Sequence, residues 1–143
     1  MITHEIKKKV ALFIKETVGG GTIKLGTGGG STNPTATDLD VPLSTTESIT
    51  ATSSDDKVIE FSGSFSGGNL QGYTIREMGI FGTMPQDDQF DDMVDNTRTS
   101  GSTEATDSTY ATETTMLSRV NFEAIGNFST SDTIDIIYTM EVE

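Results

Sequence analysis

Residues 73 to 82 read Y-T-I-R-E-M-G-I-F-G, and an extended conformation of this segment would place apolar side chains on both of its faces. Alternate side chains of a strand point to opposite faces, so Ile75 and Phe81 share one side while Met78 and Ile80 share the other. A strand of this kind is most stable when both faces are covered. We therefore predict that residues 73 to 82 form a central strand.

The polar residues of this strand need partners, because a buried unpaired charge is costly. Glu77 is expected to pair with an arginine such as Arg119, which lies in another predicted strand. A glycine in mid-strand usually marks a bulge or the close approach of another backbone. We therefore assign structural roles to Arg76, Glu77, Gly79, Phe81 and Arg119.

Several other segments also have the pattern of a strand. An antiparallel pair is predicted at 48 to 52 and 57 to 65, and Ile59, Phe61 and Phe65 share one face of its second strand. The remaining strands are predicted at 22 to 26, 116 to 125 and 134 to 142, the last with the clearest period of two. Residues 35 to 47 are expected to be a polar, turn-rich segment anchored by Leu39, Val41 and Leu43.

Residues 3 to 18 are predicted to form a helix that begins at Thr3 as N-cap and ends at the glycines 19 to 21. Ile6, Val10 and Phe13 fall on one side of it, together with Ile14 and Val18. This side could pack on the sheet of its own domain. Alternatively the helix docks on an acidic neighbour, such as an adjacent copy of the chain, with Ile6, Val10 and Phe13 as the partner contacts.

The composition indicates one acidic domain spanning residues 1 to 143. Nine Lys and Arg stand against 22 Asp and Glu, a net charge of −13 that repels nucleic acid and anionic membrane surfaces. An acidic, lysine-poor surface is typical of a protein that functions at high salt, where its charge repulsion is screened. The alternative is an acidic protein that functions at ordinary salt concentration. We expect synthesis in the cytoplasm and no binding to nucleic acid or membranes.

Residues 83 to 114 form an acidic insertion between the predicted β regions 22 to 82 and 115 to 143. Clustered carboxylates can hold a cation, although the spacing does not match an EF-hand, and a solvated acidic loop is the alternative. The weak metal-ligand candidates are Asp87, Asp88, Asp91, Asp92 and Asp95. The candidates for partner contact in this segment are its large side chains, Phe90, Met93 and Tyr110.

Motifs for catalysis or cofactor binding are missing from the sequence. The chain contains no Cys and a single His, which argues against a Cys or Ser nucleophile paired with His. The glycine-rich run at 26 to 34 lacks the Gly-Lys-Ser/Thr ending of a phosphate loop, so it is expected to supply tight turns and close backbone packing. We predict a protein that is not an enzyme and has no cofactor.

Four motifs carry a resemblance to a known family. They are I-K-L-G-T-G at 23 to 28, D-V-P-L at 40 to 43, I-R-E-M-G-I-F at 75 to 81 and M-L-S-R-V-N-F at 116 to 122. In the order and spacing of these four motifs, the chain resembles the small tail-fibre and baseplate-type structural proteins of tailed bacterial and archaeal viruses. The resemblance covers roughly residues 1 to 82 and 115 to 143, and the acidic insertion has no counterpart in it.

Together, the patterns predict a mainly β protein: an antiparallel β-sandwich with an N-terminal helix and a long acidic loop insertion. The resemblance implies a virion protein, a tail or baseplate adaptor or fibre-base module, most simply of a halophilic archaeal virus. Its partners would be other virion proteins and copies of itself in a trimer or another cyclic oligomer. The alternatives are a capsid decoration or turret subunit, a receptor- or carbohydrate-binding module, and a small halophilic enzyme.

Overall fold

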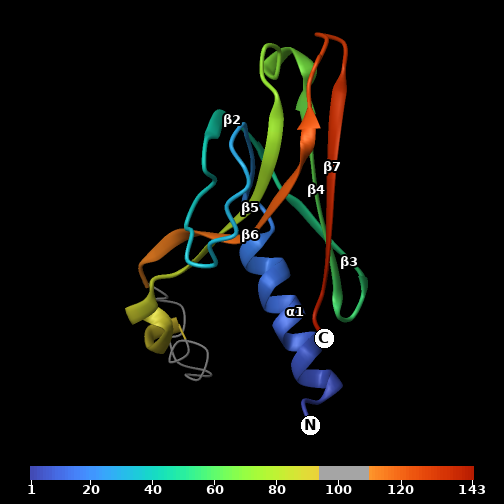
Figure 1. Cartoon of the computed structure of the whole chain (residues 1–143). Coiled ribbons are helices and arrows are strands. Elements are labelled where there is room, and N and C mark those ends of the chain that lie inside the picture. The colour runs from blue at the N-terminus through green and yellow to red at the C-terminus, as the bar shows by residue number, and fades with distance from the viewer. Residues whose placement is uncertain (94–109) are drawn as a thin grey trace. The chain divides into compact units, whose positions relative to one another are not determined.

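A computed structural model describes residues 1–93 and 110–143. The protein is mainly β, with two antiparallel sheets and an N-terminal helix (Figure 1), which confirms the predicted fold class. The chain divides into two compact units, the first made of residues 1–82 and 116–143 and the second of residues 83–115.

Helix α1 spans His4–Val18 in the first unit, as predicted. The Thr3 side chain accepts a hydrogen bond from the amide of Ile6 at its start, and the Gly19 amide donates to the carbonyl of Lys15 at its end (2.8 Å). His4 also lies 3.3 Å from a carboxylate oxygen of Asp56, which ties the start of the helix to the turn between two strands. Among the described residues, no helix is long and apolar enough to cross a membrane.

The larger sheet has the strand order β2-β1-β5-β6. Its strands are β1 (Thr22–Gly26), β2 (Pro42–Ser48), β5 (Ile75–Pro85) and β6 (Thr112–Ile125). Strand β1 pairs with both of its neighbours in antiparallel register, and Ile23 lies between Glu47 of β2 and Ile80 of β5.

Strand β2 corrects the prediction of a turn-rich segment at 35 to 47. Its side chains alternate between exposed and half-buried, but the half-buried ones include Thr45 and Glu47 as well as Leu43. The segment therefore lacks the apolar alternation that identifies a strand in sequence. It becomes a strand because β1 offers it a free edge to pair with.

The smaller sheet has the order β3-β4-β7 and confirms the predicted antiparallel pair and C-terminal strand. Its strands are β3 (Thr50–Asp55), β4 (Val58–Ser66) and β7 (Thr133–Glu141). Phe61 of β4 lies opposite Tyr138 of β7, and their rings stack with centroids 6.3 Å apart. A short 3-10 helix, η1 (Gly67–Asn69), follows β4.

The core is built mainly from β1, β4 and β5, and the two sheets approach each other at β2 and β4. Ile59, Phe61 and Phe65 are fully buried on one face of β4, as predicted. A side chain at Gly63 of β4 would collide with Ile23, since a Cβ there would lie 2.8 Å from the Ile23 Cδ1. The buried apolar residues are Ala11, Val18, Ile23, Leu25, Leu39, Ile49, Ile59, Phe61, Phe65, Leu70, Ile75, Met78, Ile80 and Phe81.

Strand β5 is covered on both faces, as its sequence predicts. Ile75 and Phe81 are buried on one face, and Met78 and Ile80 on the other. Arg76 is the exception, because it lies near the start of the strand and is exposed to solvent. Its expected need for a buried partner therefore does not arise.

Helix α1 packs beside β3 and β4 through only part of the side that its periodicity suggests, since Val18 is buried and Ile14 half-buried. Only Ala11 and Val18 are buried, whereas Ile6, Val10 and Phe13 are 51%, 42% and 36% exposed. The interpretation that these three residues pack on the sheet of their own domain is wrong. Ala11 and Val18 face the rest of the unit, whereas Ile6, Val10 and Phe13 face outward.

In the second unit, hydrogen bonds join its two ends. The Gln86 amide donates to the carbonyl of Ala111 (3.0 Å), and the Ala111 amide donates to the side chain of Gln89 (3.3 Å). A 3-10 helix, η2 (Asp87–Gln89), lies between them in sequence. Phe90 is 40% exposed, while Met93 and Tyr110 are half-buried.

Candidate functional site

The carboxylate of Glu77 is fully buried and accepts two backbone hydrogen bonds. Its Oε1 accepts from the amide of Val41 (2.8 Å) and its Oε2 from the amide of Asp40 (3.1 Å). Both donors belong to residues 27 to 41, which join β1 to β2 and are called the connecting segment below. The two amides thus give each oxygen of the carboxylate a hydrogen-bond donor without a cationic partner. Glu77 therefore holds the connecting segment onto β5.

Two glycines make room for this carboxylate. A Cβ at Gly26 would overlap Glu77 Oε1 and lie 2.7 Å from the carbonyl oxygen of Val41. A Cβ at Gly28 would lie 2.7 Å from the Asp40 Cβ and 3.1 Å from Glu77 Oε1. The prediction of close packing is confirmed at Gly26 and Gly28, which accommodate the Glu77 carboxylate, whereas a Cβ at Gly30 would have no neighbour within 4 Å.

Arg119 of β6 holds the same segment from a second strand. Its side chain is only 8% exposed; Nη1 lies 3.3 Å from Asp40 Oδ1, and Nη2 donates to the carbonyl of Ser31 (2.7 Å). The expected pair of Arg119 with Glu77 is therefore not formed. The reason is geometric: both oxygens of Glu77 already face backbone amides, whereas the carboxylate of Asp40 is free to meet the guanidinium.

Two further side chains complete the attachment. Asn121 of β6 donates from Nδ2 to the carbonyl of Ser31 (2.9 Å). Lys24 of β1 lies 3.2 Å from Asp38 Oδ1, and its ammonium sits 4.4 Å from the centre of the Phe81 ring. Side chains from β1, β5 and β6 thus fix the connecting segment at several points.

Removing the Arg119 side chain is expected to loosen the connecting segment. In Arg119→Met, the Ser31 carbonyl loses a charge-assisted donor and Asp40 loses its cation, so we expect a loss of about 1.5 kcal/mol of unfolding free energy. Hydrogen exchange of the amides at 31 to 40 should become roughly tenfold faster. Lys57→Met removes a half-buried cation elsewhere and is the control. Equal exchange in the two variants would contradict an anchoring role.

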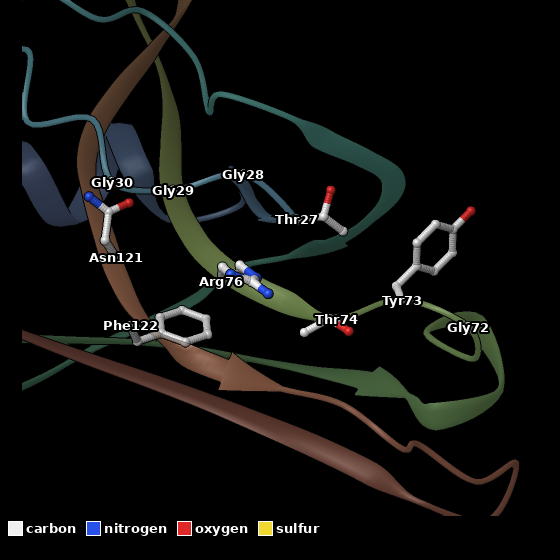
Figure 2. A pocket seen from close by; sticks show the side chains of 10 residues that line it. All are labelled: Thr27, Gly28, Gly29, Gly30, Gly72, Tyr73, Thr74, Arg76, Asn121 and Phe122. Atoms are coloured by element: carbon white, nitrogen blue, oxygen red, sulfur yellow. The ribbon is translucent and has the colours of Figure 1, made fainter.

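A groove of about 650 Å³ lies at the edge of the connecting segment (Figure 2). The residues that line it are Thr27, Gly28, Gly29, Gly30, Gly72, Tyr73, Thr74, Arg76, Asn121 and Phe122. Arg76 lies in the middle of this set, with Asn121 and Phe122 on one side and Tyr73, Thr74 and Thr27 on the other. The groove therefore presents one cation, two aromatic rings and several hydrogen-bonding groups to solvent.

Helix α1 carries a second exposed feature. Ile6, Val10 and Phe13 are spaced by three or four residues on one side of the helix and are 51%, 42% and 36% exposed, and Ile2, which lies just before the helix, is 66% exposed. These four residues are called the α1 apolar face below. A hollow of about 470 Å³ lies beside it and is lined by Ile2, Ile6 and Val10 together with Val142 from the other end of the chain. Figure 1 shows that both termini lie at this end of the helix.

The charge of α1 differs from that of the chain around it. The helix contains Lys7, Lys8, Lys9 and Lys15, which are four of the nine basic residues of the chain. Its two acidic residues are Glu5 and Glu16, whereas the whole chain has 22. An apolar face therefore lies on a locally basic helix of a strongly acidic protein.

The predicted metal-ligand candidates lie in the second unit. Asp87, Asp88, Asp91 and Asp92 are exposed, and Asp95 lies outside the described residues. Across residues 1–93 and 110–143, no three or more His, Cys, Asp or Glu side chains are grouped as a metal site would require. The predicted contact residues Phe90, Met93 and Tyr110 belong to the same unit, and their role stays a prediction.

Comparison with known proteins gave no relative: no protein-family model matches the chain, and no curated protein matches it. Function is therefore inferred from the residues and their geometry. Three features are available for that inference: the fixed connecting segment, the groove around Arg76 and the α1 apolar face.

Proposed function

We propose that this chain is a structural assembly module that joins copies of itself into a cyclic oligomer through the α1 apolar face. We further propose that the oligomer belongs to the tail or baseplate of a tailed virus, as an adaptor or fibre-base module. The exposure of the α1 apolar face, with Lys7 and Lys9 beside it on the same helix, is the observation that supports assembly. The four motifs that resemble tail-fibre and baseplate-type proteins support the placement in a virion.

Burial of the α1 apolar face would be favourable. Removing apolar surface from water contributes roughly 25 cal/mol per Å², and the centre of a stable interface is typically apolar with a polar rim. Ile6, Val10 and Phe13 would form that centre. Lys7 and Lys9 would lie at the rim, where their aliphatic stems can cover apolar surface while their charges stay hydrated, whereas Lys8 and Lys15 lie beside Asp55 and Asp56 of the same chain.

Charge complementarity favours a second copy as the occupant. The helix is locally basic, whereas the chain as a whole has a net charge of −13. Another copy of the chain therefore offers the acidic surface that the lysines of α1 would meet. A cyclic arrangement repeats this contact around a ring and leaves no apolar helix face exposed at an end.

Matched substitutions on α1 test the assembly. Val10 and Leu12 are 42% and 37% exposed, but only Val10 belongs to the α1 apolar face. We expect the wild-type chain to sediment as an oligomer and Val10→Glu to weaken its association at least 100-fold, because a charge would be buried at the interface. Leu12→Glu should retain the oligomer. A monomeric wild-type protein at high concentration, or equal dissociation by both variants, would rule out this interface.

The location in the particle needs a separate test. Antibodies against the purified chain, bound to intact virus particles and viewed by electron microscopy, should label the tail. Labelling confined to the head would replace the tail assignment by a capsid decoration or turret subunit, while absence from purified particles would remove the virion assignment. Neither result would affect the measurement of self-association.

A further inference from the structure

We propose that the groove around Arg76 binds a carboxylated sugar residue, such as a uronic acid at the end of a surface glycan. This inference concerns a different part of the first unit from the α1 apolar face, and it does not depend on the oligomer. It rests on the guanidinium at the centre of the groove, on the groups at its two sides and on its size.

Arg76 is the group that would recognise the carboxylate. Its side chain is exposed in the middle of the groove (Figure 2), and within the described ranges no carboxylate lies within ion-pair distance of it. None of the residues that line the groove is acidic, although the chain contains 22 Asp and Glu. A guanidinium presents parallel N–H donors that match the two oxygens of a carboxylate. The local charge of the groove is therefore opposite to that of the protein.

Aromatic rings on either side of Arg76 suit a sugar ring. Phe122 is half-buried on β6, and Tyr73 is 47% exposed just before β5. Figure 2 places Phe122 on one side of Arg76 and Tyr73 on the other. Aromatic side chains offer a large apolar surface, and the tyrosine adds a hydroxyl that can bond to a ligand. The C–H faces of a pyranose could lie against such rings while its carboxylate meets Arg76.

Hydrogen-bonding groups around the rings suit the sugar hydroxyls. The Asn121 amide nitrogen donates to Ser31, which orients the side chain and leaves its Oδ1 as an acceptor. Thr27 and Thr74 contribute hydroxyls at the opposite side of the groove. Gly29 and Gly30 have φ angles of 114° and 97°, a region that glycine adopts without strain, and they add no side chain to the wall. The opening therefore stays accessible to a ring-shaped ligand.

The size of the groove and the screening of charge are compatible with this ligand. Small-molecule sites typically measure about 300 to 1,000 Å³, and the groove measures about 650 Å³. The net charge of −13 would repel a distant anion, but at physiological ionic strength this repulsion is screened beyond about 8 Å. The short contact to Arg76 would persist under these conditions.

Titration of the isotope-labelled full chain with glucuronate, followed by amide NMR shifts, tests the proposal. Glucose is the matched neutral probe, and acetate is the matched anion without a sugar ring. We expect glucuronate to shift the amides of Tyr73, Thr74 and Asn121 and to bind about tenfold more tightly than either control probe. Arg76→Gln should lower the affinity for glucuronate about tenfold and leave the weaker response to glucose unchanged.

Two further variants separate the contribution of the Arg76 charge to binding from that of the Phe122 ring. Lys57→Gln removes one positive charge away from the groove and should bind glucuronate as the wild type does. Phe122→Ala should weaken the binding of glucuronate and of glucose to the same extent, without changing the response to acetate. The proposal is overturned if glucuronate causes no shifts at the groove, if acetate binds as tightly as glucuronate, or if Arg76→Gln binds glucuronate like the wild type. The amide spectrum of each variant reports whether it is folded.

Discussion

Glu77→Ala is expected to lower the free energy of unfolding by about 3 kcal/mol. The substitution removes the acceptor for the amides of Asp40 and Val41, and hydrogen bonds to a charged group each contribute roughly 1.5 to 3 kcal/mol. It also leaves an empty space where the buried carboxylate lay. The connecting segment would detach from β5, so its amides should exchange much faster with solvent.

Urea denaturation at equilibrium measures this loss, and two variants provide its controls. Glu60→Ala removes a half-buried glutamate from β4 and should cost less than 1 kcal/mol, as expected of a substitution without a special contact. The free energy of unfolding of Glu77→Gln should fall between those of the wild type and Glu77→Ala. The amide group of Gln keeps one acceptor, but it also turns an N–H donor toward a backbone N–H. Equal stability of Glu77→Ala and Glu60→Ala would show that the buried carboxylate is not an anchor.

Gly26→Ala is expected to lower the free energy of unfolding by about 3 kcal/mol through a different mechanism. The added methyl group would overlap Glu77 Oε1 and lie 2.7 Å from both Glu77 Cγ and the Val41 carbonyl oxygen. Overpacking of this kind typically costs 1 to 3 kcal/mol, and here it also displaces the hydrogen-bonded carboxylate. Gly68→Ala is the control, since the nearest atom to its added carbon would be 3.6 Å away. It should change stability by less than about 0.5 kcal/mol.

The double variant tests whether the two residues act on the same contact. In Gly26→Ala with Glu77→Ala, the added methyl group no longer meets a carboxylate. The combined loss of stability should therefore be at least about 1 kcal/mol smaller than the sum of the two single losses, as for other residues in direct contact. Full additivity would mean that Gly26 is required for some reason other than the space that Glu77 occupies.

The regular elements were largely predictable from the sequence, because strands and helices with one apolar face carry a period. Residues 57 to 65 and 134 to 142 have the alternation of a strand, and the structure confirms both as β4 and β7. The pattern failed at β2, whose half-buried Thr45 and Glu47 give no apolar period. It also failed for the orientation of α1, because a period of 3.6 identifies an apolar face without showing what covers it.

The contacts of the candidate sites were less predictable. Glu77 was expected to meet a side chain, but it binds the amides of residues 36 and 37 positions earlier, and backbone donors leave no trace in the residue pattern. The glycines at 26 and 28 were the available signal that a group approaches closely there. The groove is built from three separate segments, 27 to 30, 72 to 76 and 121 to 122, so only the pairing of β1, β5 and β6 brings it together.

The attachment of the connecting segment also constrains the order in which the chain can fold during synthesis. Its donors at Asp40 and Val41 leave the ribosome well before Glu77, which lies 37 residues after Asp40, and Arg119 follows 79 residues after Asp40. Until β5 has emerged, the segment has no acceptor for these amides, and a nascent chain stalled at residue 70 would hold it unattached. The connecting segment can therefore form its native contacts only after Glu77 and Arg119, which follow it in the chain, have been synthesised.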